Sequence, residues 1–385
     1  MQASDHDAIP DALLGWYDAH ARTLPWRAKP GEPRQDPYRV WLSEVMLQQT
    51  TVAAVGKYYA RFLALWPTVG ALAQAEDSAV MAEWAGLGYY ARARNLIACA
   101  RSVAADGGAF PDTEDGLRAL PGLGAYTAAA VAAIAFDRRA VVVDANVERV
   151  VARLFLIETP LPAARRAIRA GADAITPGMR AGDFAQAMMD LGATICTPRR
   201  PRCLLCPLAG PCRANAEGDP QTLPVRPAKK AKPQRRGTAY WIERDIGGSR
   251  QVWLVTRAAK GMLGAMRALP DDGWAARGDG DERPPITARW EPMGRVVHSF
   301  THFDLELQLM RAADLDTLGP DTLNSDTSAL KDGEWWPVTA IEAAGLPTVF
   351  AKATLLVLAD TTLAKTTLAK TTLAKTTLAP GDAAQ

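Results

Sequence analysis

The sequence predicts a multi-domain protein in which an all-α domain precedes an α+β domain. Up to about residue 214, apolar residues recur with the i, i+3, i+4 spacing of helices, and a glycine-rich turn joins two of these helices. From residue 237 on, short segments alternate apolar and polar residues as strands do. A basic, proline-rich stretch without periodicity separates the two patterns, which is typical of a linker.

Four segments follow from these patterns: a helical domain at 1–214, a linker at 215–236, an α+β domain at 237–358 and a low-complexity tail at 359–385. The tail repeats the pentapeptide TTLAK. Leucines five residues apart turn by about 140° per step on a helix, so they build no continuous apolar face. We therefore expect the tail to be disordered.

Composition and charge narrow the class of protein. With 385 residues, of which 48% are hydrophobic and 22% charged, the chain is ordinary globular in composition and long enough for two domains. It has no uncharged apolar run of about 20 residues, and its first residues lack the features of a signal peptide. We therefore expect a cytoplasmic protein whose cysteines are ligands or core thiols. Residues 180–236 carry 11 basic against 4 acidic side chains, which indicates a surface for a polyanion.

The first candidate for chemistry follows an opening helix and a proline-rich loop. Residues 36–52 have apolar side chains at Val40, Trp41 and Val45, which predicts a helix with one face toward a core. Glu44 lies among these apolar residues. Taken alone it is typical of a solvated helical glutamate, whereas burial would raise its pKa and keep it protonated as an acid.

Two further segments could contact nucleic acid. Gln48, Gln49 and Thr50 end the same helix, and their polar groups suit base edges or insertion into a duplex, although an exposed polar helix end is the alternative. Residues 84–96 place two glycines before two tyrosines and two arginines. An aromatic ring after a tight turn can enter a base stack while arginines follow the phosphates. The alternative for the tyrosines is packing between helices.

A helical hairpin is predicted around the segment LPGLGAYTA. Thr113 is a good helix N-cap, and a short helix runs from it to Leu120. Gly122 and Gly124 let the chain reverse with its amides turned outward before a second helix begins. That helix start is suited to bind a phosphate, because its first N–H groups have no partners within the helix. A hairpin that only packs two helices together is the alternative.

Asp144 precedes a third such segment, ANVERVVARLF, whose apolar residues keep helical spacing. By itself this residue is an ordinary helix N-cap, since aspartate is among the residues preferred at that position.

Four of the five cysteines fall within 17 residues, with the pattern C-x6-C-x2-C-x5-C. They are Cys196, Cys203, Cys206 and Cys212. This density favours a metal centre with all-thiolate ligation, and no histidine stands nearby to complete a mixed site. Zinc is one alternative for the metal. Arg199 and Arg200 lie between the first two ligands, where they would give the loop a positively charged surface for phosphates. Cys99 lies outside the pattern and is expected to be a core thiol.

In the α+β domain, strands are predicted at residues 238–245 and 250–258, with a strand pair at 296–312. His298 and His302, two of the four histidines of the chain, fall in this pair. A strand with histidines on one face explains them without a functional role.

Five segments, LPWR, WLSEVMLQQT, GLGYYARARNL, LPGLGAYTA and FAQAMMDLGATIC, resemble the adenine DNA glycosylases of the MutY family closely and in the same order. The resemblance covers about residues 13–215 strongly and the C-terminal region more loosely. It implies a helix-hairpin-helix glycosylase domain with a [4Fe–4S] cluster loop, followed by a C-terminal MutT/Nudix-like domain. The implied function is excision of adenine mispaired with 8-oxoguanine or guanine from double-stranded DNA in base excision repair, by a monomer. The second domain lacks the carboxylate-rich Nudix box, so no nucleotide hydrolysis is expected.

The resemblance assigns roles to individual residues. Glu44 would protonate the adenine leaving group, and Asp144 would stabilise the positive charge on the sugar with support from Asn146. The adenine pocket would be lined by Arg27, Leu47 and Gln186. The residues implied in DNA binding are Gln48, Gln49, Thr50, Leu87, Tyr89, Gly122, Gly124, Arg199, Arg200, Phe300, Thr301 and His302, the last three of which would inspect 8-oxoguanine. The ligands of the iron–sulfur cluster would be Cys196, Cys203, Cys206 and Cys212.

Departures from the family pattern sharpen the predictions. Relatives that cleave the strand carry a lysine two residues after the second hairpin glycine, and Tyr126 occupies that position here. We therefore predict a monofunctional glycosylase, with Tyr126 among the catalytic residues. Ala145 replaces the usual glycine after the catalytic aspartate and would be strained at positive φ. Thr301 replaces a serine and keeps its hydroxyl.

Two other functions compete with this one. An endonuclease III-like glycosylase and lyase for damaged pyrimidines is the nearer alternative, and Tyr126 and the second domain weigh against it. A non-catalytic iron–sulfur protein that binds DNA or transfers electrons is the other, and it would need neither Glu44 nor an adenine pocket.

Overall fold

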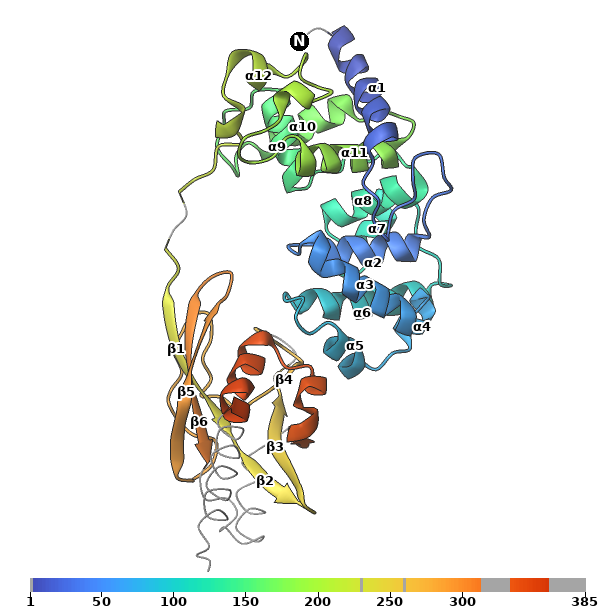
Figure 1. Ribbon diagram of the computed structural model, residues 1–385. Coiled ribbons are helices and arrows are strands. Elements are labelled where there is room, and N and C mark those ends of the chain that lie inside the picture. Colours follow the sequence, from blue (N-terminus) through green and yellow to red (C-terminus); the bar gives the residue numbers. More distant parts are fainter. Residues whose placement is uncertain (1–2, 229–230, 259–260, 313–332, 360–385) are drawn as a thin grey trace, which may run out of the picture. The chain divides into compact units, whose positions relative to one another are not determined.

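A computed structural model of the chain describes residues 3–228, 231–258, 261–312 and 333–359. It divides into two compact units (Figure 1). The first unit comprises Met1–Asp77 and Arg92–Lys229, and the second comprises Ser78–Ala91 and Lys230–Gln385. The predicted tail lies outside the described residues from residue 360 onward.

The first unit is all α, as the sequence predicts. Its helices are α1 Ala3–His20, α2 Pro37–Leu47, α3 Val52–Leu65, α4 Val69–Ala73, α6 Ala91–Ala105, α7 Glu114–Arg118, α8 Ala125–Phe136, α9 Ala145–Leu154, α10 Arg165–Ile175, α11 Ala181–Thr194 and α12 Arg213–Glu217. The helix α5 Asp77–Glu83 falls, apart from Asp77, in the second unit. No helix in the described part of the chain has both the length and the apolar character needed to cross a membrane.

Helix α8 lies at the centre of this unit, in contact with α2, α7 and α11 (Figure 1). Its sequence is apolar and mostly alanine, and every residue from Thr127 to Ala133 is buried. Small side chains let the neighbouring helices approach closely. A Cβ on Gly182 of α11 would lie 2.5 Å from the carbonyl oxygen of Ala133, so this helix contact requires glycine. The buried α8 thereby fixes the positions of α2 and α11, which carry candidate site residues.

Local capping explains where the functional helices begin. Asp36 accepts a hydrogen bond from the backbone N–H of Tyr38 at 2.9 Å, which starts α2 with Pro37 in its first turn. The Thr113 side chain accepts from the N–H of Gly116 and starts α7, as predicted. Asp144 caps α9.

The second unit is α+β. One sheet has the order β1 Gln234–Trp241, β6 Asp304–Ala312, β5 Trp290–Ser299, with β1 parallel and β5 antiparallel to β6. In the other sheet β3 Ser249–Thr256 pairs antiparallel with β2 Glu243–Ile246, β4 Arg267–Ala268 and β7 Gly333–Pro337. Figure 1 shows β1, β6 and β5 side by side. The strand pair predicted at 296–312 is the β5–β6 hairpin.

One core joins these sheets to the last helical segments, η4 Val338–Ala344 and residues 348–359. Burial alternates along β6, where Leu305, Leu307 and Leu309 point inward and are fully buried. They pack with Trp241 and Phe350. The fold class predicted from the sequence is therefore confirmed.

The predicted linker at 215–236 contains the end of α12, the turn η2 Pro220–Thr222 and the start of β1. Leu223 is buried, and its carbonyl accepts a hydrogen bond from Arg153 Nε at 3.1 Å. Because Leu161 N–H also donates to the Val225 carbonyl, residues 223–225 pack against the helical unit.

Candidate active site

Glu44 and Tyr126 form the centre of the candidate site in the first unit. α2 turns Glu44 into the protein with its buried face, and Tyr126 stands in the first turn of α8. The Tyr126 hydroxyl donates a hydrogen bond to Glu44 Oε2 at 2.7 Å. Burial raises the pKa of Glu44, while the Tyr126 bond and the charge of Arg27 oppose this rise. The pKa of Tyr126 is also raised well above its usual value by burial, so its hydroxyl stays protonated and remains a donor.

Asp144 is a second carboxyl group with a different environment. Its Oδ1 accepts from the backbone N–H groups of Asn146 at 2.9 Å and Val147 at 2.7 Å, and its Oδ2 accepts from the Asn146 side-chain amide at 2.8 Å. Asp144 thus accepts three hydrogen bonds at the N-terminus of α9, where the partial charge of the helix favours a negative group. The charge of Asp144 contributes to the raised pKa of Glu44. The site thus holds two carboxyl groups in different surroundings, and hydrolysis of a glycosidic bond generally uses a pair of carboxyl groups.

Ala145 begins α9 and is not among the residues with positive φ. The strain considered for alanine at this position is therefore absent.

Arg27 is held beside this pair by a residue that sequence reasoning missed. Asp190 of α11 is fully buried, and both of its oxygens accept from Arg27 Nη1 at 2.8 Å. Arg22 adds a bond from its backbone N–H at 3.0 Å and one from Nε at 2.5 Å. Asp190 could have been found as an acidic residue in the apolar segment FAQAMMDLGATIC, one helical turn after Gln186.

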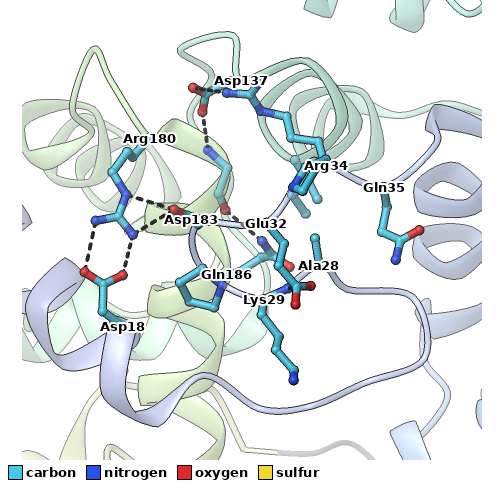
Figure 2. Close-up of a pocket in the computed structure, with 15 residues that line it drawn as sticks. Asp18, Ala28, Lys29, Glu32, Arg34, Gln35, Asp137, Arg180, Asp183 and Gln186 are labelled. Carbon is cyan, nitrogen blue, oxygen red and sulfur yellow. Dashed lines mark hydrogen bonds and ion pairs between the residues drawn. The ribbon is translucent and has the colours of Figure 1, made fainter.

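Gln186 lines a cavity of about 630 Å³ (Figure 2). Its side chain is only 6% exposed; Nε2 donates to the Gly182 carbonyl at 3.3 Å, and the buried Oε1 has no hydrogen-bond partner among the described residues. Across the cavity Arg34 forms an ion pair with Asp137 at 2.7 Å. A buried acceptor without a partner suits a ligand with an N–H donor, although Glu44, Tyr126 and Asp144 are not among the residues that line this cavity. Leu47, the third predicted pocket residue, is half-buried at the end of α2.

The hairpin has the predicted shape, but its two glycines differ. Gly122 has φ of 76°, and a Cβ there would lie 2.4 Å from Cβ of Asn95, so only glycine fits. Gly124 has φ of −79° and open space around it. In the described structure no side chain caps α8, whose first N–H groups remain available to an anion.

For Arg92, one of the two arginines of residues 84–96, the structure corrects the expectation of contact with a DNA backbone, whereas for Arg94 this contact stays a prediction. Arg92 is buried, and its guanidinium bonds to the Val45 and Met46 carbonyls at the end of α2. Leu87, predicted to contact DNA, is also buried in this structure, whereas Tyr89 is 44% exposed.

The four-cysteine loop offers four free thiols, all half-buried. Arg153 lies against the loop, 1% exposed, and donates from Nη1 to Cys196 Sγ at 3.2 Å and to the Thr197 carbonyl at 2.8 Å. Among the described residues, no three such donors come together as ligands of one metal ion would. Four thiols on a single loop remain a donor set that fits an iron–sulfur cluster chemically.

A chain of hydrogen bonds runs from Asp144 toward this loop. Asn146, bonded to Asp144, accepts from Arg149 Nη2 at 3.0 Å, and Arg149 donates to the carbonyls of Gly192 at 2.7 Å and Cys196 at 2.8 Å. α9 therefore carries both the candidate carboxylate and the arginines that hold the cysteine loop. Arg199 and Arg200, predicted to meet phosphates, are exposed on the loop.

In the second unit, the β5–β6 turn carries the predicted recognition residues. Phe300 points inward and stacks on Phe303 at 4.7 Å, while Thr301 and His302 are exposed. Lys232 Nζ donates to the Phe300 carbonyl at 2.6 Å. Within the same unit Thr301 Oγ1 lies 3.1 Å from the Tyr89 hydroxyl.

The structure thus brings Glu44, Tyr126 and Asp144 into one site. Tyr126 is hydrogen-bonded to Glu44, and the charges of Asp144 and Arg27 both act on Glu44. The β5–β6 turn, which carries the residues predicted to inspect 8-oxoguanine, belongs to a separate unit.

Comparisons with known proteins define the class. Residues 42–171 match the model of the HhH-GPD superfamily of base excision DNA repair proteins, and residues 239–355 match the NUDIX domain. The adenine DNA glycosylase of Mus musculus is 44% identical over 368 residues, an alignment that spans 80% of this chain and 71% of the mouse protein. The chain therefore belongs to the adenine DNA glycosylase family.

A second curated relative and one solved structure are also similar to the chain. The human adenine DNA glycosylase is 35% identical over 362 residues, spanning 78% of this chain and 66% of the human protein. The chain therefore spans about two thirds of that relative's length. A solved structure of a thermostable thymine-DNA glycosylase aligns with 55% of this chain and 97% of its own, at 30% identity and a TM-score of 0.49.

Proposed function

We propose that this protein is a monofunctional DNA glycosylase that removes adenine paired with 8-oxoguanine, or with guanine, from double-stranded DNA. The observation that carries the proposal is that two carboxyl groups of the site have opposite surroundings. Glu44 is buried with a raised pKa, and Asp144 is held as an acceptor by three hydrogen bonds. Family membership supports adenine as the base.

In this proposal, each group has one task. Glu44 holds a proton that passes to the adenine ring as the N-glycosidic bond breaks, which turns adenine into a neutral leaving group. Asp144 faces the sugar and stabilises the positive charge that develops there, and water completes the hydrolysis. Tyr126 holds the Glu44 carboxyl in place through its 2.7 Å bond. Because Tyr126 offers no amine, the product is an intact strand with an abasic site.

Adenine must leave the base stack to reach these groups, since Glu44 is buried. Arg27, Leu47 and Gln186 line its pocket in our proposal. The buried Gln186 Oε1 is an acceptor for the exocyclic amine of adenine. The exposed start of α8 and the Gln48–Thr50 turn contact the DNA around the extruded base.

We assign recognition of the opposite base to the second unit, where Thr301 and His302 are exposed on the β5–β6 turn. The NUDIX-like domain there serves binding and not nucleotide hydrolysis. Cys196, Cys203, Cys206 and Cys212 would hold a [4Fe–4S] cluster, which ties the loop that carries Arg199 and Arg200 into one shape. As part of the same proposal, the protein acts as a monomer in the cytoplasm.

A panel of duplexes tests the proposal. Each carries one adenine opposite 8-oxoguanine, guanine or thymine, and free adenine is measured chromatographically after single-turnover incubation. Release should be fast opposite 8-oxoguanine, slower opposite guanine and absent opposite thymine. His302→Ala should reduce the preference for 8-oxoguanine while leaving the A:G rate closer to the wild-type rate. Equal release from all three duplexes would contradict the proposed mispair specificity.

A further inference from the structure

Arg92 stands at the start of α6 and has its guanidinium inside the protein. Its Nη1 donates to the carbonyls of Val45 and Met46, each at 2.9 Å, and its Nη2 donates to Thr50 Oγ1 at 3.0 Å. The last carbonyls of a helix have no partners within the helix. Arg92 therefore caps α2 and also binds the turn that follows it, residues Gln48–Thr50, through Thr50.

That turn has a backbone conformation that its residues do not favour. Gln49 has φ of 57°, in the left-handed region that glycine adopts far more readily than glutamine. Such a conformation persists only where the surroundings hold it. Gln48 contributes one restraint by donating from Nε2 to Thr127 Oγ1 at 2.8 Å, and the bond from Arg92 to Thr50 supplies another on the other side of Gln49.

The same face of α6 also touches the glycine hairpin. Asn95, three residues after Arg92, packs directly against Gly122. A small cavity of about 20 Å³ lies between α2, α6 and the hairpin, lined by Gln48, Arg92, Asn95 and Gly122 among others. The turn, the arginine and the hairpin therefore meet around one cavity. α6 thus sets the position of the Gln48–Thr50 turn relative to the hairpin.

We propose that Arg92 is a positioning residue that holds the Gln48–Thr50 turn in the conformation that enters the duplex. The turn is then ordered before DNA arrives, and no binding energy is lost in arranging it. The inference rests on the proposed function in one respect, namely that this turn contacts DNA. The arginine itself lies behind the turn and acts through Thr50 and the end of α2.

The positioning role of Arg92 is tested by measuring how well the protein extrudes the base. The full-length protein is titrated with a duplex that carries 2-aminopurine in place of adenine opposite 8-oxoguanine, and the fluorescence rise reports the unstacked base. Arg92→Met should raise the Kd for this duplex by about tenfold or more and reduce the fluorescence rise at saturation. Arg92→Lys, which keeps the charge but not the fork of donors, should fall between. The pH profile of adenine excision should keep its midpoint, because Glu44 is untouched.

Arg101 of the same helix supplies the matched control. It donates to the carbonyls of Ala73 and Ala75 and pairs with Asp77, so it also joins α6 to a neighbouring helix end, away from the Gln48–Thr50 turn. Arg101→Met should lower thermal stability without changing base extrusion. Extrusion and Kd at wild-type values in the folded Arg92 variants would overturn the inference.

If Arg92→Met does not fold, Thr50→Val provides the test instead. The valine removes one acceptor of Arg92 but leaves the bonds of Arg92 to the carbonyls at the end of α2. Thr50→Val should reduce extrusion, and Arg92→Lys should reduce it little further when added to Thr50→Val. Additive losses would overturn the inference. A wild-type protein that extrudes the base but releases no adenine would contradict the proposed function instead, and it would leave the role of Arg92 intact.

Discussion

Replacing Asp190 by asparagine tests how the site is held together. Asp190 is fully buried, Arg27 is 8% exposed, and two oxygen–nitrogen contacts of 2.8 Å join them. Asparagine keeps the shape but removes the charge, so the Arg27 guanidinium is left buried without a counter-ion. Breaking a buried pair in this way costs about 3–5 kcal/mol.

The chain provides a matched control for this change. Asp18 also pairs with an arginine, Arg180, but the two side chains are 47% and 40% exposed. Arg180 keeps a second partner in Asp183. Exposed pairs contribute about 0.2–1 kcal/mol, so Asp18→Asn should change stability by no more than that.

Urea unfolding followed by the helical circular dichroism signal compares the two variants with the wild type. Asp190→Asn should also slow adenine excision by at least about tenfold, equivalent to 1.4 kcal/mol in the barrier, because Arg27 loses the contact that places it near Glu44. Equal unfolding midpoints for Asp190→Asn and Asp18→Asn would refute the assignment of Asp190 as the anchor of Arg27.

Three further changes test other parts of the site. The rate of excision should fall as pH rises through the raised pKa of Glu44. Tyr126→Phe should move this fall to higher pH, because the hydrogen bond that it removes lowers the pKa of Glu44. Single-turnover rates from pH 5 to 9 check this. A carboxyl group whose pKa is raised in the folded protein makes that protein less stable as pH rises. Glu44→Gln should therefore unfold at a higher urea concentration than the wild type at neutral pH, but not at acid pH. Gly122→Ala should lower both thermal stability and DNA affinity, because its Cβ would clash with Asn95, whereas Gly124→Ala should fold normally; calorimetry and duplex titration distinguish them.

Several local features of the site could be predicted from the sequence because they depend on neighbours along the chain. Asp144 was expected as a helix N-cap, and it accepts two backbone N–H groups at the start of α9. The hairpin turn was expected from its glycines, and Gly122 has the positive φ that such a turn needs. Burial of Glu44 was an open question, because a glutamate beside apolar residues on a helix is more often solvated than buried.

Partners distant in sequence could not be predicted. Asp190 and Arg22 are separated by 168 residues, and only the packing of α11 against the first part of the chain brings them together. Arg92 was expected to follow phosphates because arginine commonly does so, but the open carbonyls at the end of α2 provide a nearer set of acceptors. Charged side chains are therefore the residues whose role the sequence indicates least well.

The most direct test of the central claim uses an end-labelled duplex with a single A:8-oxoguanine pair. After incubation with the protein, strand breaks are measured with and without hot alkali, beside Glu44→Gln. We expect breaks on the adenine strand only after alkali, and none with Glu44→Gln. Breaks without alkali would show that an amine of the protein cleaves the strand, and intact strands under both conditions would contradict adenine excision itself.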